Sequence, residues 1–411
     1  MSEQQLSYPK EKINILLLEN INPKAVEQFN AASYENVELL KKALQDEELI
    51  DKLQGVHILG IRSKTQVTKE VLEKADKLLA VGCFCIGTNQ VDLDTAAELG
   101  ITVFNSPYSN TRSVAELVIA ESIMLIRRIP ERNHAAHLGK WMKDNQRSYE
   151  LRGKTIGIVG YGHIGSQVSV LAESLGLNVI YYDIEPKLPL GNADPVKEIE
   201  TLFEQSDIVT LHVPQTEETK DMVTAPLLQK IKKDAVFINL SRGNVVDLDA
   251  LKELLESGHI KGAAIDVFPE EPRSNYDPFV SPLQKLPNVI LTPHIGGSTI
   301  EAQINIGFDV SNKLINLLDN GSTVGSHSVP ELNLPVQKDT TRLLHIHKNR
   351  TGVLSAINKV FSKYKVNIAG QYLKTNESIG YVVIDFQGDQ SSELLQELRN
   401  IEHTIRARFL Y

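Results

Sequence analysis

A chain of 411 residues is too long for a single hydrophobic core, so its length predicts two or three domains. Hydrophobic residues make up 42% and charged residues 23% of the sequence, which is the balance of a water-soluble globular protein. A formal net charge of −9 argues against a protein that coats nucleic acid or an anionic membrane. Any anionic ligand would therefore need a local cluster of positive side chains.

The two cysteines, Cys83 and Cys85, are separated by one residue in a predicted strand. Neighbours this close rarely form a disulfide, and no Cys/His set with metal-ligand spacing accompanies them. We therefore expect buried, reduced thiols and no metal site. The N-terminus has no apolar run, and no stretch approaches the roughly 18 apolar residues of a membrane span, so a cytoplasmic protein is expected.

Residues 13–100 alternate short apolar runs with amphipathic segments, beginning with INILLLE and NPKAVEQFNAAS. This alternation predicts βαβ units on a parallel sheet. The apolar-periodic segment SVAELVIAESIMLIRRI then predicts a long helix that joins this first unit to a second. Another helix is predicted after Gly297 and is expected to return to the first unit. We therefore take 1–107 and 298–330 as one discontinuous domain of flavodoxin-like type, which would bind the substrate.

The second unit, 108–297, repeats the α/β rhythm with nearly continuous Val, Ile and Leu strands, as expected when helices cover both faces of a parallel sheet. A linker is predicted at 331–339. The remainder, 340–411, has the order βαββαβ of a ferredoxin-like sandwich. The predicted fold class is α/β, with two doubly wound parallel-sheet domains and one ferredoxin-like domain.

A G-x-G-x-x-G motif at Gly160, Gly162 and Gly165 lies between a predicted strand and a predicted helix. The first glycine permits the tight turn, the second lets a pyrophosphate approach the backbone, and the third allows close helix–strand packing. The helix N-terminus favours the anion. Asp183 ends the next strand, where a carboxylate would bind the ribose hydroxyls and repel a 2′-phosphate. A Rossmann domain that binds NAD is predicted; the alternative is an ordinary βαβ turn.

Three polar side chains, Arg242, Glu271 and His294, each follow a predicted strand of the second unit. Ligands of open parallel sheets bind beyond the carboxyl ends of the strands, so these side chains are expected to meet. Histidine suits the uptake of a hydroxyl proton, a carboxylate beside it raises its pKa, and arginine binds a carboxylate with two hydrogen bonds. Singly, each has a structural or surface alternative; together they predict an NAD-dependent dehydrogenase of a 2-hydroxy acid.

A second group combines two basic residues with neutral hydrogen-bond donors in an otherwise acidic protein. Arg62 and Ser63 follow an apolar strand, Asn110 precedes the joining helix, and Trp141 and Lys143 lie in GKWMKD. Together they predict a cradle for a phosphate or carboxylate. The alternative is that they are surface residues, with the tryptophan filling a gap.

The segments VGYGHIG, NLSRGNVVD, DVFPEEP and TPHIGGST resemble the D-2-hydroxyacid dehydrogenase family. This resemblance implies that Arg242 binds substrate, Glu271 tunes the histidine and His294 is the acid/base, with Arg242 and His294 also touching the cofactor. It implies further NAD contacts from His163, Ile164, Leu240, Ser241, Asp266, Gly296 and Gly297.

From about Ile13 onward the chain resembles the branch of that family that oxidises 3-phosphoglycerate to begin L-serine synthesis and carries a C-terminal ACT domain; GIRS, YSNTRSVAEL and TIRARFLY carry the match. The resemblance implies a homotetramer in which Trp141 and Lys143 act across a subunit contact, and reduction of 2-oxoglutarate as a side reaction. Two alternatives stay open. A dehydrogenase of unphosphorylated acids would need neither the basic cluster nor the tail, and an NAD-sensing binding protein would not need the three catalytic residues.

In the C-terminal domain His347, Asn349 and Asn367 match positions that hold L-serine in ACT domains, which implies feedback inhibition by L-serine. An imidazole and amides suit a zwitterion because they offer donors and acceptors without excess charge. Thr351 stands where proline is common in the family, so the fixed φ of a proline at the helix start is given up. The alternative is a domain used only for assembly.

Overall fold

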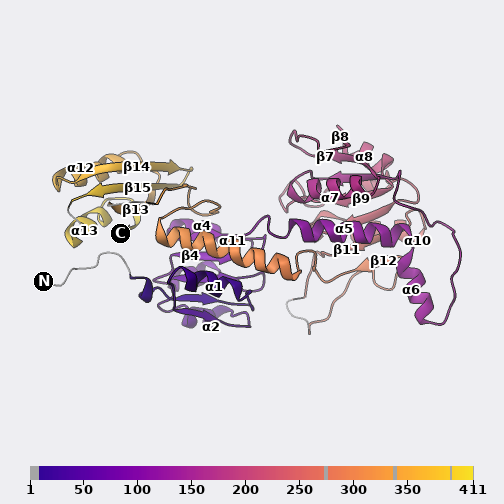
Figure 1. Cartoon of the computed structure of the whole chain (residues 1–411), viewed down its shortest axis with the longest axis horizontal. Coiled ribbons are helices and arrows are strands. Elements are labelled where there is room, and N and C mark those ends of the chain that lie inside the picture. Colours follow the sequence, from indigo (N-terminus) through magenta and orange to yellow (C-terminus); the bar gives the residue numbers. More distant parts are fainter. Residues whose placement is uncertain (1–8, 273–275, 337–339, 389–390, 411) are drawn as a thin grey trace. The chain divides into compact units, whose positions relative to one another are not determined.

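The structure, a computed structural model, describes residues 9–272, 276–336, 340–388 and 391–410 (Figure 1). The chain divides into two units, one formed by the residues up to 109 together with those from 303 onward, and one formed by residues 110–302. The three-domain boundaries expected from the sequence stay a prediction. Among the described residues, no helix is both long and apolar enough to cross a bilayer.

The first unit contains a parallel five-stranded sheet of order β2-β1-β3-β4-β5. Its strands are β1 (Ile15–Leu17), β2 (Val37–Leu39), β3 (Ile58–Ile61), β4 (Ala80–Cys83) and β5 (Thr102–Phe104). Its helices are α1 (Lys24–Ala31), α2 (Asp46–Lys52), α3 (Lys69–Lys74), α4 (Leu93–Glu98) and most of α11 (Ile300–Asp319). Helix α11 packs close to the sheet at Gly82, where an added Cβ would lie 2.7 Å from Val310.

The same unit carries an antiparallel sheet of order β14-β15-β13-β16. The elements are β13 (Thr341–Lys348), α12 (Val353–Lys363), β14 (Asn367–Thr375), β15 (Ile379–Gln387), α13 (Ser392–Arg399) and β16 (Thr404–Leu410). Both helices cover one face of this sheet, because their apolar stripes share a core with Leu343, Phe386 and Phe409. The βαββαβ prediction for the C-terminal region is confirmed.

The second unit contains a seven-stranded parallel sheet of order β12-β11-β10-β9-β6-β7-β8. The strands are β6 (Thr155–Val159), β7 (Asn178–Tyr182), β8 (Ala193–Pro195), β9 (Ile208–Leu211), β10 (Val236–Asn239), β11 (Gly262–Ile265) and β12 (Val289–Leu291). The helices are α5 (Thr111–Ile126), α6 (Ile129–His137), α7 (His163–Ser174), α8 (Ile199–Gln205), α9 (Ala225–Leu228) and α10 (Leu248–Glu256). This order reverses between β6 and β9, the doubly wound arrangement that places ligands beyond the strand ends.

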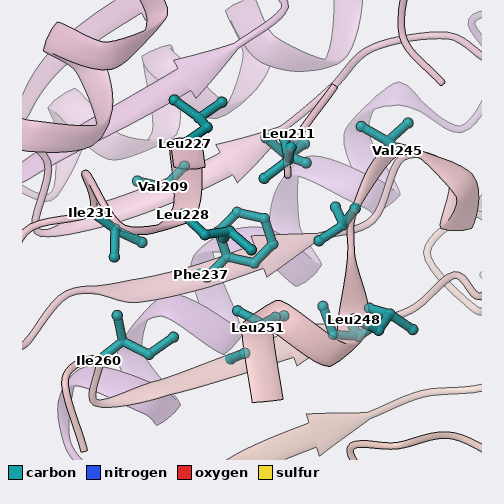
Figure 2. Packing of buried hydrophobic residues seen from close by; sticks show 14 of the residues in the cluster. Val209, Leu211, Leu227, Leu228, Ile231, Phe237, Val245, Leu248, Leu251 and Ile260 are labelled. Atoms are coloured by element: carbon teal, nitrogen blue, oxygen red, sulfur yellow. The ribbon is translucent and has the colours of Figure 1, made fainter. Parts of the chain in front are cut away.

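Apolar side chains fill both faces of this sheet. Figure 2 shows one face, where Val209 and Phe237 from adjacent strands pack with Leu228 and Leu251, all fully buried. On the other face α5 and α7 pack on the same strands through a separate cluster that includes Val118. These sheets confirm the fold class predicted from the sequence. The strands of the second unit are rich in branched apolar residues because helices bury both faces of their sheet.

Candidate active site

The glycine motif lies where β6 ends and α7 begins. Gly160 has φ +90°, and an added Cβ would lie 2.5 Å from the carbonyl oxygen of His212, so the turn requires glycine. A Cβ on Gly165 would lie 2.2 Å from the carbonyl oxygen of Gly160, whereas one on Gly162 would meet no atom within 4 Å. The backbone at Gly162 is therefore open to a ligand at the start of α7, which fits a pyrophosphate.

Asp183 follows β7 and lies beside this loop. Its Oδ2 accepts a hydrogen bond from the backbone N–H of Tyr161 at 2.8 Å, and its Oδ1 accepts one from the N–H of Glu185 at 3.0 Å. The carboxylate is thereby fixed at the edge of the glycine loop, while its side chain stays only partly buried. This position suits the ribose contact expected from the sequence.

Three other loops leave the same edge of the sheet, because all its strands are parallel. Arg242 follows β10, Glu271 follows β11 and His294 follows β12. The Nδ1 atom of His294 lies 2.8 Å from Oε2 and 3.0 Å from Oε1 of Glu271. The structure therefore brings together the histidine and carboxylate that the sequence predicted as a pair.

The electrostatics of this pair agree with its geometry. The hydrogen bond to Glu271 raises the pKa of His294, and the charges of Glu271 and Asp266 act in the same direction; together they outweigh the burial and the charge of Arg242, which lower it. Burial alone would raise the pKa of Glu271, but the hydrogen bond and charge of His294, the N–H of Phe268 and the charge of Arg242 together lower it. The carboxylate is thus ionised, and the imidazole half of the pair takes up a proton more readily than a free histidine.

Arg242 is held by its own loop. Asn239, fully buried at the end of β10, donates from Nδ2 to the carbonyl of Arg242 at 3.0 Å and accepts from the N–H of Ser241 at 3.0 Å. Gly243 then packs on the next loop, where an added Cβ would lie 1.9 Å from the carbonyl carbon of Phe268. Asn239, which the sequence analysis did not single out, therefore sets the course of the arginine loop.

Asp266 organises the loop that carries the histidine. Its Oδ1 accepts hydrogen bonds from Thr292 Oγ1 at 2.6 Å and from the N–H of Ile295 at 2.8 Å, and its Oδ2 accepts one from the N–H of Gly296 at 2.8 Å. The residue is 1% exposed. The sequence resemblance implied an NAD contact here; the observed hydrogen bonds give Asp266 a positioning task that the motif did not reveal.

The remaining predicted cofactor residues line the same edge. Leu240 and Ser241 are buried beneath it, while His163 at the start of α7 is exposed. Asn110 is buried against Gly297, since an added Cβ on this glycine would lie 2.3 Å from Asn110 Nδ2. The other two, Ile164 and Gly296, lie in the glycine loop and beside Asp266.

Arg62 and Ser63 belong to the other unit and follow β3. Glu19, which is buried at the end of β1, accepts hydrogen bonds from the N–H groups of Arg62 at 3.1 Å, Lys64 at 3.0 Å and Thr65 at 2.9 Å. Gln90 donates to the carbonyl of Arg62 at 2.7 Å. The backbone that presents Arg62 is thus fixed from both sides, by residues that the sequence analysis did not select.

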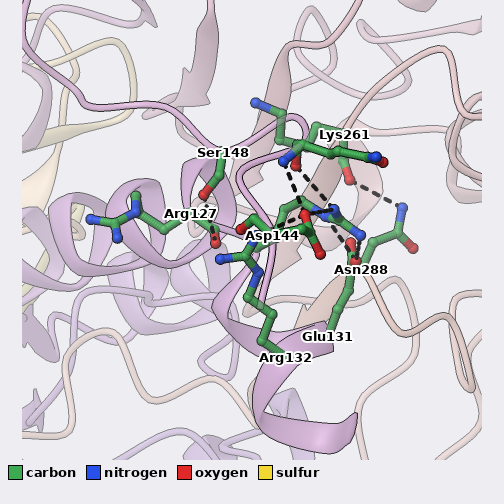
Figure 3. Close-up of polar contacts among 9 residues, drawn as sticks. Arg127, Glu131, Arg132, Asp144, Ser148, Lys261 and Asn288 are labelled. Carbon is green, nitrogen blue, oxygen red and sulfur yellow. Dashed lines mark hydrogen bonds and ion pairs between the residues drawn. The ribbon is translucent and has the colours of Figure 1, made fainter. Parts of the chain in front are cut away.

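Trp141 and Lys143 lie on an exposed segment between α6 and β6, and Trp141 is 88% exposed. Figure 3 shows how this segment is held: Arg132 contacts Asp144 at 3.3 Å, and the Ser148 hydroxyl donates to the carbonyl of Arg127 at 3.3 Å. A braced segment therefore presents a large aromatic side chain to solvent. The expectation that this tryptophan fills a gap within the chain is not met, and a contact with another molecule is favoured.

The three predicted effector residues lie at two ends of the C-terminal sheet. His347 pairs with Gly380 on β15, whereas Asn367 pairs with Gln387 on the same strand. Seven residues of strand separate these positions, which is roughly 20 Å. Asn349 lies at the His347 end, where its Nδ2 donates to the carbonyl of Asn376 at 2.7 Å. Within one chain, His347 and Asn349 are brought together and Asn367 is not.

Comparison with known proteins agrees with this geometry. Residues 119–296 match the family described as D-isomer specific 2-hydroxyacid dehydrogenase, NAD binding domain, which confirms the predicted cofactor. Residues 343–406 match the AHAS small subunit-like ACT domain. The solved structure of a D-2-hydroxyisocaproate dehydrogenase is similar with a TM-score of 0.69 and 26% identity, covering 77% of this chain and 100% of that one.

Curated relatives match the whole chain. A D-3-phosphoglycerate dehydrogenase from Escherichia coli (strain K12) is 54% identical over 409 residues, covering 99% of this chain and 100% of the relative. Another from Haemophilus influenzae is 52% identical over 407 residues, covering 99% of each. Together with the paired histidine and glutamate at the edge of an NAD-binding sheet, this similarity shows that the chain belongs to the D-3-phosphoglycerate dehydrogenase family.

Proposed function

We propose that the protein oxidises 3-phospho-D-glycerate to 3-phosphohydroxypyruvate with NAD, the first step of L-serine synthesis. The observation that carries the proposal is the contact of His294 with Glu271 at 2.8 Å, at the edge of a sheet that also bears the glycine loop. When bound, NAD supplies the hydride acceptor for the reaction. The remaining tasks belong to side chains of the protein.

His294 removes the proton of the C2 hydroxyl. Its Nδ1 is engaged by the ionised Glu271, so Nδ1 carries the proton and Nε2 is the acceptor. Glu271 holds the ring and stabilises the imidazolium that forms. Arg242 binds the substrate carboxylate. The residues predicted to cradle a phosphate or carboxylate, called the basic group here, bind the anionic groups of the substrate; they are Arg62, Ser63, Asn110, Trp141 and Lys143.

The test measures the appearance of NADH at alkaline pH with 3-phosphoglycerate, D-glycerate and D-lactate as separate substrates. We expect the largest kcat/KM with 3-phosphoglycerate, because only it offers a phosphate to the basic group. Turnover of D-lactate at an equal rate would contradict the assignment. Oxidation of NADH in the presence of 2-oxoglutarate tests the side reaction, for which the same His294 would act as the proton donor.

We further propose a homotetramer in which Trp141 and Lys143 contact a neighbouring subunit. The exposure of Trp141 on a braced segment supports this, since an isolated aromatic side chain held in solvent is a typical interface anchor. Analytical ultracentrifugation of Trp141→Ala should show dissociation to a smaller species. Leu188→Ala is the control, because that side chain is equally exposed, at 89%, and lies outside this segment.

L-Serine is proposed to bind between the ACT domains of two copies. One copy would supply His347 and Asn349, and the other Asn367, because these positions lie at opposite ends of the sheet. Burial lowers the pKa of His347, so its ring is neutral and offers both a donor and an acceptor to the amino acid. Inhibition requires serine to bind the less active arrangement more tightly than the active one.

A mixing experiment tests the shared site. His347→Ala and Asn367→Ala should each abolish inhibition by serine. When the two variants are co-expressed, each mixed pair of subunits contains one site with both partners intact, so partial inhibition should return. Absence of any recovery in isolated mixed oligomers would mean that the two residues do not act on one ligand across an interface.

The free state of Cys83 and Cys85 supports a proposed cytoplasmic location, where thiols remain reduced. Cell fractionation with an untagged chain provides the test.

A further inference from the structure

Within the first unit, the C-terminal sheet packs its second face on the lobe that contains β1–β5. Leu344 and Ile346 of β13 and Tyr381 of β15 form this face, and the Tyr381 hydroxyl donates to the carbonyl of Gly321 at 2.7 Å. The contact is close, because an added Cβ on Gly321 would lie 2.4 Å from Leu344. We call this contact the ACT joint.

Two arginines of β16 enter the ACT joint side by side. Arg406 and Arg408 are two residues apart, so their side chains leave the strand on the same face. Arg406 Nη1 donates to the carbonyl of Leu78 at 2.6 Å, and Arg408 Nη2 donates to the carbonyl of Leu317 at 3.1 Å. Both acceptors are neutral carbonyl groups of the lobe, and each arginine uses only one of its five N–H donors in these bonds.

No carboxylate forms an ion pair with either arginine in the part of the chain that the structure describes. Arg342 in the same joint shows the usual arrangement, since Asp385 accepts from it twice, at 2.6 and 2.7 Å. Asp319 is engaged elsewhere, by Tyr34 at 2.6 Å and Lys10 at 2.8 Å. Loss of hydration lowers the pKa of Arg406 to about 10, with the charge of Arg408 acting in the same direction, and it also lowers the pKa of Arg408.

A small cavity in the ACT joint is lined by both arginines and by residues of the lobe. It has a volume of about 20 Å³, which suffices for one water molecule or one monatomic ion. Its lining includes Arg406, Arg408, Thr102 and Thr323, with apolar walls from Leu79 and Leu344. A carboxylate or phosphate is too large for this space. Two adjacent cations that line a cavity of this size, with N–H donors beyond the one that each gives to the lobe, have the chemistry of a halide site.

We propose that the cavity of the ACT joint binds one chloride ion, which accepts hydrogen bonds from Arg406 and Arg408 and links the ACT domain to the lobe. The anion offsets the repulsion between the two guanidinium groups and supplies a charged acceptor beside the two neutral carbonyls of the lobe. This site is distinct from the proposed serine and substrate sites, so its failure would leave the proposed function untouched.

The direct test is a crystal of the full-length protein grown or soaked in sodium bromide. Anomalous scattering at the bromine edge should give a peak within hydrogen-bond distance of both guanidinium groups. A map with ordered water in the cavity and no anomalous peak there would overturn the proposal.

A solution test uses urea unfolding of the full chain in chloride and in gluconate at equal ionic strength. Because only the folded joint binds the ion, a tenfold rise in chloride above its dissociation constant should raise the folded-to-unfolded ratio about tenfold. Arg406→Met removes one donor group and should abolish this response, whereas Arg112→Met, at an exposed helical ion pair with Glu116, should retain it. Equal stability of the unmodified protein in both salts, or an unchanged response in Arg406→Met, would overturn the proposal. If Arg406→Met does not fold, the bromide map decides.

Discussion

Nδ1 of His294 lies 2.8 Å from Oε2 of Glu271, although 23 residues separate them in the chain. The histidine has φ +55°, in the left-handed region, which turns its side chain back toward the loop that follows β11. Since the carboxylate fixes Nδ1, Nε2 becomes the only ring nitrogen that can exchange a proton with a substrate.

Glu271→Gln should shift the pH dependence of both directions. The carboxylate raises the pKa of His294, so its loss lowers that pKa. Oxidation needs the neutral ring, so its acid limb should move to lower pH; reduction needs the imidazolium, so its alkaline limb should also move to lower pH. We expect kcat to fall about 10²-fold because the ring loses its orientation. Glu270→Gln, at the exposed neighbour, should leave both profiles of kcat/KM in place.

Arg242→Lys should raise KM for the hydroxy acid, with kcat/KM falling by about 10- to 100-fold. A lysine keeps the charge but cannot form two parallel hydrogen bonds to a carboxylate. Steady-state kinetics should show this loss, while fluorescence titration of NADH binding stays nearly constant. Equal weakening of cofactor and substrate would contradict a role centred on the substrate, and would indicate that the arginine acts through its loop or through a cofactor contact.

Asp266→Asn should slow catalysis mainly by loosening the loop that carries His294. The amide cannot accept at both former oxygens, so it loses at least one of the hydrogen bonds to Thr292, Ile295 and Gly296, at about 1–3 kcal/mol. We expect lower kcat, a lower Tm, and a shift of the acid limb of oxidation to lower pH that is smaller than the shift in Glu271→Gln, because the charge of Asp266 raises the pKa of His294 less than Glu271 does. A shift as large as that of Glu271→Gln would show that Asp266 acts mainly through its charge on His294 and not through the loop.

Glu121→Gln should remove a pH-dependent loss of stability. Glu121 on α5 is 2% exposed, neither carboxyl oxygen has a hydrogen-bond partner among the described residues, and burial raises its pKa to about 8. The unfolded chain ionises this group near its ordinary pKa of about 4.3, so the folded state binds more protons between that pH and 8. The unmodified protein should therefore lose stability as pH rises from about 4.3 to 8, by a few kcal/mol.

The variant should lack this slope. Urea unfolding of both proteins at pH 6 and pH 8 gives the comparison, with Glu116→Gln, exposed on the same helix, as the control. Parallel slopes in Glu121→Gln and the unmodified protein would show that the carboxyl group is not protonated in the folded state.

The strands of the second unit could be predicted because β6, β9 and β10 are continuous apolar runs between turns. Strands β2 and β8 were not predicted, because they have three residues each and only partly apolar sequences. It also extended the helix at 111–126 too far. Arg128 adopts a left-handed conformation with φ +55°, which ends that helix and starts α6, a short and mostly polar helix without a clear stripe.

The residues that follow strands could be predicted by a single rule, since the carboxyl ends of parallel strands share an edge. The residues that hold these loops in place could not be predicted. Glu19, Asn239 and Asp266 act through hydrogen bonds to backbone N–H or C=O groups of loops, and a backbone group leaves no mark in a sequence. For Glu19 a signal was present, because it directly follows the apolar run ILLL that contains β1. The separation of Asn367 from His347 depends on strand register, which the order of elements does not give.

The carboxylate of Asp266 also makes the state of the catalytic loop observable without any substrate. The amide protons of Ile295 and Gly296 are bonded to it and to nothing in solvent, so they exchange with deuterium only when the loop opens. Their exchange rates therefore report how often the loop that carries His294 opens. Mass spectrometry on the protein without substrate would measure the exchange rates of these two amides. Variants could then be ranked by how well the loop is held in place, without an activity assay.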